Sequence, residues 1–182
     1  MKNILNKLLD FFELTIIGAL IFMTVYFFIG QLVVVSGDSM EPTFKNNQQL
    51  LAEKLTINIT TINRGDIVIF NSIGSNFENS HLLIKRVIGL PGEKIKIQSG
   101  IVYINNVPLE ENYLNKDVYT NLKYNTKVIE GEEYEIGENS YFVLGDNRDN
   151  SVDSRVFGAL HKNSIIGKVV LRYYPFKNFK II

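Results

Sequence analysis

Two side chains in this sequence have the chemistry of a nucleophile and its base: the hydroxyl of Ser39 and the amine of Lys85. Ser39 lies between Gly37 and Pro42, and a glycine and a proline at these spacings favour a tight bend that can present the hydroxyl to a cleft. Lys85 lies in the run 82–88, which is mostly apolar. Taken alone, each segment also fits an ordinary loop or a lysine that extends to solvent.

Burial would give the Lys85 amine the properties of a base. A lysine in water titrates near ~10.4 and is protonated at neutral pH, so it cannot accept a proton. Desolvation disfavours the ammonium form and lowers the pKa. A pKa lowered by roughly 2–3 would leave neutral amine to take the proton of a serine hydroxyl.

A third segment is unusually polar and follows the apolar run 141–144. It reads Gly-Asp-Asn-Arg-Asp-Asn-Ser-Val-Asp-Ser-Arg over residues 145–155. Asx turns and Asp–Arg pairs would make it rigid. A calcium-binding loop is the alternative, but Arg148 and Arg155 interrupt the oxygen-bearing side chains and the spacing is not that of an EF-hand. We expect no metal site and no cofactor.

The composition excludes several classes of protein. The 182 residues suffice for one domain with a hydrophobic core. Nineteen basic residues balance nineteen acidic ones, so the net charge gives no reason to expect nucleic acid as a partner. The absence of cysteine excludes a disulfide scaffold, a thiolate nucleophile and a Cys-ligated zinc.

The N-terminal part of the chain has the length and polarity of a membrane anchor. Residues 14–37 carry no charge and are mostly large and apolar, and roughly 20 such residues in a helix cross a bilayer. A buried core helix is less consistent with a stretch that has no polar face. A cleaved signal would end in small residues, whereas Val33, Val34 and Val35 are bulky.

The basic residues predict the orientation of this anchor. Lys2 and Lys7 precede it and the first basic residue after it is Lys45, so the positive-inside rule predicts a cytoplasmic N-terminus. The chain would then sit in the cell membrane as a single-pass protein with its main domain on the outer face. We predict three parts: a cytoplasmic N-terminus (1–13), a transmembrane anchor (14–35) and an extracytoplasmic domain (36–182).

The remainder of the chain is predicted to be mainly β. Short β-branched runs are separated by Gly, Asn and Pro and lie at 50–55, 66–71, 82–89, 94–97, 101–104, 141–144 and 168–173. Ser99-Gly100 predicts a hairpin turn, and a second turn follows at Asn105-Asn106. Residues 110–139 are weakly patterned and are interpreted as loops and edge strands.

Together, four segments resemble the bacterial type I signal peptidase (leader peptidase) family, in the short single-span form typical of Gram-positive bacteria. They are Ser39-Met40-x-Pro42-Thr43, Gly65-Asp66-Ile67-Val68, the run from Lys85 to Glu93, and Gly145 to Ser151 with Asp153-Ser154-Arg155. The resemblance covers nearly the whole chain. It implies one β-rich extracytoplasmic catalytic domain behind a transmembrane helix, and a serine endopeptidase that removes signal peptides.

The resemblance also implies roles for individual residues. Ser39 would be the nucleophile, and Lys85 would be the general base and later the acid for the leaving amine. The backbone N–H of Ser39 would bind the oxyanion. Some family members supply a second donor from a hydroxyl two residues earlier, but here that position is Gly37, and Ser36 is one residue too early.

A supporting group is implied behind this pair. Ser151 would hydrogen-bond Lys85 and orient it. Asp153 and Arg155, with Arg86 nearby, would form an ion-paired support. Asp146 is included in this group.

The implied substrate is the signal peptide of an exported preprotein, bound by strand addition between two extended segments. Shallow apolar pockets would admit small side chains at the first and third positions before the cut. The predicted substrate-binding residues are Val35, Ser36, Gly37, Asp38, Met40, Leu82, Leu83 and Ile84. The lipid bilayer is the other expected partner.

Three alternatives are weaker. A Ser-His-Asp hydrolase would need His81 or His161, and neither is flanked by a triad signature. A membrane-anchored assembly factor of the same fold would have no need of Ser39 and Lys85 together. A self-cleaving repressor-type protease is disfavoured by the anchor and by the lack of a DNA-binding helix pair.

Overall fold

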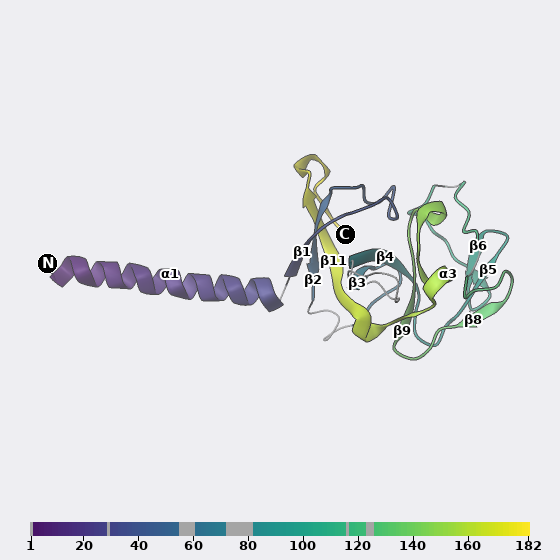
Figure 1. Cartoon of the computed structure of the whole chain (residues 1–182), viewed down its shortest axis with the longest axis horizontal. Helices are drawn as coiled ribbons and strands as arrows, with labels where there is room; N and C mark the ends of the chain where they lie inside the picture. Colours follow the sequence, from purple (N-terminus) through teal and green to yellow (C-terminus); the bar gives the residue numbers. More distant parts are fainter. Residues whose placement is uncertain (1, 29, 55–60, 72–81, 116, 123–125) are drawn as a thin grey trace.

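The structure is a computed structural model that describes residues 2–28, 30–54, 61–71, 82–115, 117–122 and 126–182. One long helix, α1 (Lys2–Phe28), precedes a domain built almost entirely of antiparallel strands. Figure 1 shows α1 projecting away from this domain, with the second of its two sheets at the far end of the molecule. The prediction of a mainly β chain is confirmed.

The helix α1 ends before the end of the predicted anchor. It ends at Phe28, and residues 30–34 of the predicted span 14–35 form strand β1 instead, because they pair with β2 from Gly30↔Glu53 to Val34↔Gln49. The uncharged part of α1 is therefore 14–28, which is roughly 22 Å at 1.5 Å per residue. Within the residues that the structure describes, no helix has the length and apolarity that a membrane span requires.

The larger sheet carries both candidate catalytic segments. Its strand order is β1-β2-β11-β3-β4-β9-β10, with β12 beside β11. The bounds are β1 (Gly30–Val34), β2 (Gln49–Glu53), β3 (Ile67–Asn71), β4 (Leu82–Gly89), β9 (Ser140–Leu144), β10 (Leu160–His161), β11 (Ile165–Tyr174) and β12 (Lys180–Ile181). Register shifts along β11 let one long strand pair with both β2 and β3, which bends the sheet.

The smaller sheet has the order β7-β6-β5-β8. Its strands are β5 (Lys94–Gln98), β6 (Ile101–Ile104), β7 (Val107–Pro108) and β8 (Glu133–Glu135). The predicted turn at Ser99-Gly100 is present, since Gln98 pairs with Ile101 and both turn residues have positive φ. Asn105-Asn106 forms the next turn in the same way. The short helices are η1 (Arg148–Asn150), α3 (Ser154–Phe157), η2 (Lys162–Ser164) and η3 (Phe176–Asn178).

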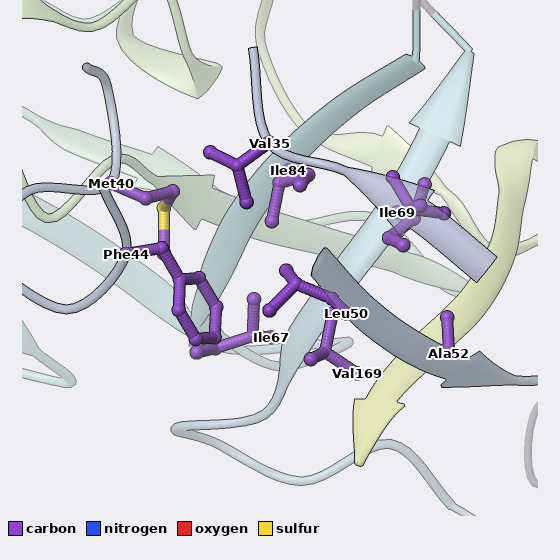
Figure 2. Close-up of a cluster of buried hydrophobic side chains, with 10 residues drawn as sticks. Val35, Met40, Phe44, Leu50, Ala52, Ile67, Ile69, Ile84 and Val169 are labelled. Atoms are coloured by element: carbon purple, nitrogen blue, oxygen red, sulfur yellow. The ribbon is translucent and has the colours of Figure 1, made fainter. Parts of the chain in front are cut away.

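One hydrophobic cluster fixes the turn that carries Ser39. Met40 and Phe44 are fully buried in it, together with side chains from β1, β2, β3, β4 and β11. Figure 2 shows Met40 beside Phe44, and Val35 beside Ile84 of β4. The segment after Ser39 is therefore anchored by two side chains that bury large apolar areas, and the hydroxyl is not on a freely moving loop.

A different cluster joins the two sheets, and Gly89 at the end of β4 is packed into it. A Cβ at Gly89 would lie 2.2 Å from Ile136 Cδ1 and 3.1 Å from Phe142 Cβ, and both side chains are fully buried. We expect Gly89→Ala to lower the free energy of unfolding by about 1–3 kcal/mol, because a closely packed core cannot absorb the methyl group. Urea denaturation measures this change.

Gly137→Ala is the matched control for this substitution. Its Cβ would meet only Ser140 Oγ at 3.9 Å, so we expect a change within about 0.5 kcal/mol. Equal stability of the two variants would contradict the close packing of the sheets at Gly89.

Candidate active site

The structure brings Ser39 and Lys85 into direct contact. Lys85 Nζ lies 2.8 Å from Ser39 Oγ and also donates to the carbonyl oxygen of Ile84 at 2.9 Å. β4 positions the lysine, which pairs with Val68 of β3. The turn between β1 and β2 positions the serine, and its backbone is closed by a bond from Phe44 N to Met40 O.

Lys85 is withdrawn from solvent. The residue is 2% exposed, and burial lowers the pKa of its amine from 10.5 to about 8, against the opposing effects of Asp153 and Asp146. Near neutral pH a useful fraction of the amine is therefore uncharged. An uncharged amine at 2.8 Å can accept the Ser39 proton, which an ammonium cannot do.

The polar segment 145–155 holds the backbone on either side of the serine hydroxyl. Asn147 donates from its backbone to Ser39 O at 3.0 Å and from its side chain to Asp38 O at 3.1 Å. A Cβ at Gly145 would lie 2.5 Å from Ser39 O and 2.5 Å from Ser151 Cβ. Only glycine at position 145 allows the two segments to approach so closely.

Asp146 links β4 to the nucleophile turn. Its carboxylate accepts from Arg86 Nε at 2.8 Å and from Arg86 Nη2 at 2.6 Å, which is a bidentate pair. The same carboxylate accepts from Thr43 Oγ1 at 2.5 Å. Arg86 and Lys85 alternate along β4, so the ion pair lies on the face of the strand opposite Lys85.

Asp153 holds the second half of the segment. It forms a bidentate pair with Arg155, at 2.9 Å for both Nε and Nη2, and accepts the backbone N–H of Gly145 at 3.1 Å. The implied support of Asp153, Arg155 and Arg86 is thus two separate ion pairs, because Asp146 is the carboxylate that Arg86 contacts.

A third buried ion pair was missed by the sequence analysis. Arg148 is almost fully buried and pairs with Glu111, with Nη1 at 2.9 Å from Oε2, and its Nη1 also donates to Thr120. The Tyr113 ring lies 4.0 Å from Arg86 Cζ. Both acceptors and the ring come from the stretch 110–122, which carried no expected role. A buried arginine demands a carboxylate, but several acidic residues in that stretch fit equally well.

Ser151 does not make the implied hydrogen bond to Lys85. Its hydroxyl is buried and has no hydrogen-bond partner within the residues that the structure describes, and the amine donates to Ser39 and Ile84 instead. That expectation is corrected: Ser151 packs against Gly145, and the amine donates to Ser39 Oγ and to the carbonyl oxygen of the adjacent Ile84.

The residues predicted to bind substrate fall into two groups. Ser36, Gly37, Asp38 and Leu82 are exposed, and Leu83 is half-buried. Val35, Met40 and Ile84 are buried in the cluster of Figure 2. Met40 is 1% exposed, so its side chain is a core group rather than an open wall of a binding site.

Neither histidine forms a triad in the described part of the molecule. His161 is exposed and accepts the backbone N–H of Asn163 at 3.2 Å, so it caps helix η2. His81 lies outside the described residues. In those same ranges no group of three acidic or histidine side chains has a metal-binding arrangement.

The sequence matches the family model described as "Signal peptidase, peptidase S26" over residues 8–174. The chain belongs to this family. It is similar to signal peptidase I of Bacillus caldolyticus, with 36% identity over 168 residues that cover 86% of each chain. It is also similar to signal peptidase I of Leptolyngbya laminosa, with 35% identity over 152 residues, 81% of this chain and 70% of the relative.

A crystal structure of a signal peptidase I from Enterococcus faecalis V583 was also matched. It is 35% identical, with a TM-score of 0.45, and the match covers 60% of this chain and 97% of that one.

The burial of the Lys85 amine leads to a prediction about stability. The pKa of Lys85 is lowered on folding, so below about 8 the folded protein carries the full cost of a desolvated ammonium, and stability should rise as the pH goes from about 8 to 10.5. Lys85→Met removes this titration. Over that pH interval the wild type should gain stability and the variant should not. We therefore expect the unfolding free energy of the variant minus that of the wild type to fall by up to about 3 kcal/mol.

The measurement is chemical denaturation as a function of pH, with the exposed Lys45→Met as the control. A wild-type protein and a Lys85→Met variant with parallel pH profiles would rule out a desolvated amine at this position.

Proposed function

We propose that this chain is a membrane-attached serine endopeptidase that removes N-terminal signal peptides from exported preproteins. The observation that carries the proposal is the 2.8 Å contact between Ser39 Oγ and a lysine amine that is 2% exposed. Membership of the signal peptidase family supports the substrate class. The assembly-factor alternative is not supported, because the relatives reported above are named as peptidases and both members of the pair are present.

The proposed reaction follows from the positions of the two groups. Neutral Lys85 takes the Ser39 proton as Oγ bonds to the carbonyl carbon of the scissile peptide, and the carbonyl electrons move onto oxygen. The ammonium then gives this proton to the leaving nitrogen as the C–N bond breaks. Water, deprotonated by the same amine, hydrolyses the acyl-enzyme and restores Ser39. The Ser39 N–H is one donor to the oxyanion, and Gly37 has no side chain to supply another.

The pairing of β4 supports substrate binding by strand addition. β3 pairs with residues 82–86 along one edge of β4, whereas β9 pairs only with Arg86, Val87 and Gly89 along the other. In the described part of the larger sheet, the second edge of residues 82–85 therefore has no strand beside it. An extended peptide bound there would place its carbonyl groups next to Lys85.

The side chains beside this edge support a preference for small residues. Val35 and Ile84 are adjacent in Figure 2, and both belong to the buried cluster that fixes the turn of Ser39. Bulky core side chains leave shallow depressions rather than deep pockets. We propose that the first and third residues before the cut face these depressions, which sets the requirement for small side chains at those positions.

α1 and one face of the larger sheet support attachment to a membrane. Apolar side chains along α1 are exposed, for example Leu14 at 70% and Phe22 at 72%. The hydroxyls of Thr15 and Thr24 donate to carbonyl groups of their own helix, as they would in an apolar medium. We propose that α1 anchors the chain, with its N-terminus cytoplasmic and the β domain outside.

A row of apolar residues crosses the sheet next to the end of α1. Leu32 pairs with Leu51, Leu51 with Leu171, and Leu171 with Ile181, so four strands contribute one side chain each to the same face. Leu32 is 53% exposed and Ile181 is 76% exposed. This row continues the apolar surface of α1 and supports contact of the β domain with lipid.

We expect Ser39→Ala, Lys85→Ala and Lys85→Arg each to reduce preprotein cleavage by at least about 10⁴-fold, because a dyad acts as a unit and a guanidinium remains protonated. Wild-type kcat/KM should rise with pH through the lowered Lys85 pKa of about 8. Mass spectrometry of the cut site and initial rates measure both effects. The control is Ser164→Ala, which removes a hydroxyl from η2. Turnover by Lys85→Arg would contradict the proposal that Lys85 is the base.

The attachment is tested by alkaline extraction and by protease accessibility of each terminus in intact cells. We expect the chain to resist extraction and an N-terminal tag to be protected. Ile17→Lys with Leu20→Lys should release the chain, whereas Val107→Lys should not, although Val107 is a still more exposed apolar residue in the smaller sheet. A wild-type chain released by carbonate, or an N-terminal tag digested from outside, would contradict the proposed anchor and orientation.

A further inference from the structure

A pocket of about 480 Å³ lies on the face of β4 opposite Lys85. It is lined by Pro42 and Thr43 of the turn that follows Ser39, and by Arg86 and Tyr113. The C-terminal strands β11 and β12 close it. Its volume is in the range of pockets that bind small molecules. The proposed peptide path runs along the free edge of residues 82–85 of β4, and none of these residues lines the pocket.

Three cationic side chains line this pocket. They are Arg86, Arg172 and Lys180, and no carboxylate side chain of a described residue lines it with them. Arg172 and Lys180 are register partners of β11 and β12, so their side chains leave the sheet on the same face. Asp146 pairs with Arg86, whereas neither Arg172 nor Lys180 forms an ion pair with a carboxylate among the described residues.

Arg172 differs from every other arginine of the chain. Arg64, Arg86, Arg148 and Arg155 each pair with a carboxylate. In the described part of the chain Arg172 hydrogen-bonds only to neutral oxygens: Nε donates to Asn178 O at 2.7 Å, and Nη1 to Thr43 O at 2.9 Å and Gln48 Oε1 at 3.4 Å. Its Cζ also lies 5.9 Å from the centre of the Phe44 ring.

The Nη2 group of Arg172 therefore has two N–H donors with no acceptor among these residues. A guanidinium that is held at three points and lines a pocket is preorganised to bind an oxyanion there.

The remaining walls are apolar. Ile67 is buried at the base, and Ile181 lines the pocket while remaining 76% exposed. Ile181 also belongs to the apolar row proposed above to meet lipid. That row lies on the face of β12 opposite Lys180, and Ile181 is the residue that the pocket and the row share. A free phosphate ion is much smaller than about 480 Å³, whereas a phosphate group with a glycerol unit attached would occupy more of it.

We propose that this pocket binds a phosphate group, with Arg172 Nη2 and Lys180 Nζ as its ligands, and that a phospholipid headgroup supplies it. Thr43 and Arg86 both line the pocket and both hold Asp146. A bound headgroup would therefore contact the same residues that fix the nucleophile turn, from the side away from the reaction.

The test uses the full chain with Ser39→Ala in a nonionic detergent, so that binding is read without turnover. Thermal unfolding is followed with inorganic phosphate, with phosphatidylglycerol in mixed micelles, and with diacylglycerol as the phosphate-free lipid, all at matched ionic strength. We expect phosphatidylglycerol to raise the Tm and diacylglycerol to have no effect. A response to inorganic phosphate of the same size would keep the site and overturn the lipid source.

Lys180→Gln and Lys177→Gln form the matched pair, because both lysines are exposed in the same C-terminal segment and only Lys180 lines the pocket. We expect Lys180→Gln, and likewise Arg172→Gln, to weaken phosphatidylglycerol binding roughly tenfold, the effect of one charge-assisted hydrogen bond. Lys177→Gln should bind as the parent does. Equal losses in Lys180→Gln and Lys177→Gln, or no Tm response to either phosphate compound, would overturn the proposal. Since the readout is binding, its failure leaves the proposed peptidase activity untouched.

Discussion

A lysine amine kept out of water, and within hydrogen-bonding distance of a serine hydroxyl, is the constraint on which this site depends. Two requirements conflict there. Burial lowers the pKa of Lys85, while Asp146 and Asp153 raise it. Each of these carboxylates forms a bidentate pair with an arginine, Arg86 or Arg155, so much of its field is neutralised locally. The net effect is a pKa of about 8 rather than one near that of a free lysine.

The polar segment 145–155 holds the two residues of this contact in position. Gly145 lets the segment approach within contact of Ser39 O, and Asn147 then holds the backbone carbonyls of Asp38 and Ser39. Asp146 reaches the nucleophile turn and β4 simultaneously. One short segment thus determines the distance between two side chains that are 46 residues apart in the chain.

Buried arginines also join the smaller sheet to the site. Arg148 donates to Gly145 O and pairs with Glu111, which lies in the excursion between β7 and β8. Tyr113 of the same excursion stacks on Arg86. Removing one partner of a buried pair typically costs about 3–5 kcal/mol, because an uncompensated charge remains. The excursion is therefore part of the support of the site, although it contributes no group to the proposed chemistry.

The sequence by itself predicted most of the longer strands and the pairing of Ser39 with Lys85, which the structure brings into contact. Period-two patterns and turn residues such as Ser99-Gly100 are local properties, so β2, β3, β4, β5, β6, β9 and β11 were predicted from neighbouring residues, whereas the short strands β7, β8, β10 and β12 were not. Four motifs in order identified Ser39, Lys85, Asp146, Asp153 and Arg155 as members of one site. The helix end was misplaced by several residues, because pairing of residues 30–34 with β2 overrides an apolar pattern that suits a helix equally well.

Only the tertiary structure decided which partners those residues have. Arg86 pairs with Asp146, Arg148 with Glu111, and Ser151 has no bond to Lys85, and none of these follows from composition or spacing. From the sequence one can predict that a buried cation needs a carboxylate partner, but many carboxylates of the chain could fill that role. The choice is made by chain folding over tens of residues, since only the packed sheets bring one candidate within about 3 Å and exclude the water that would satisfy the others.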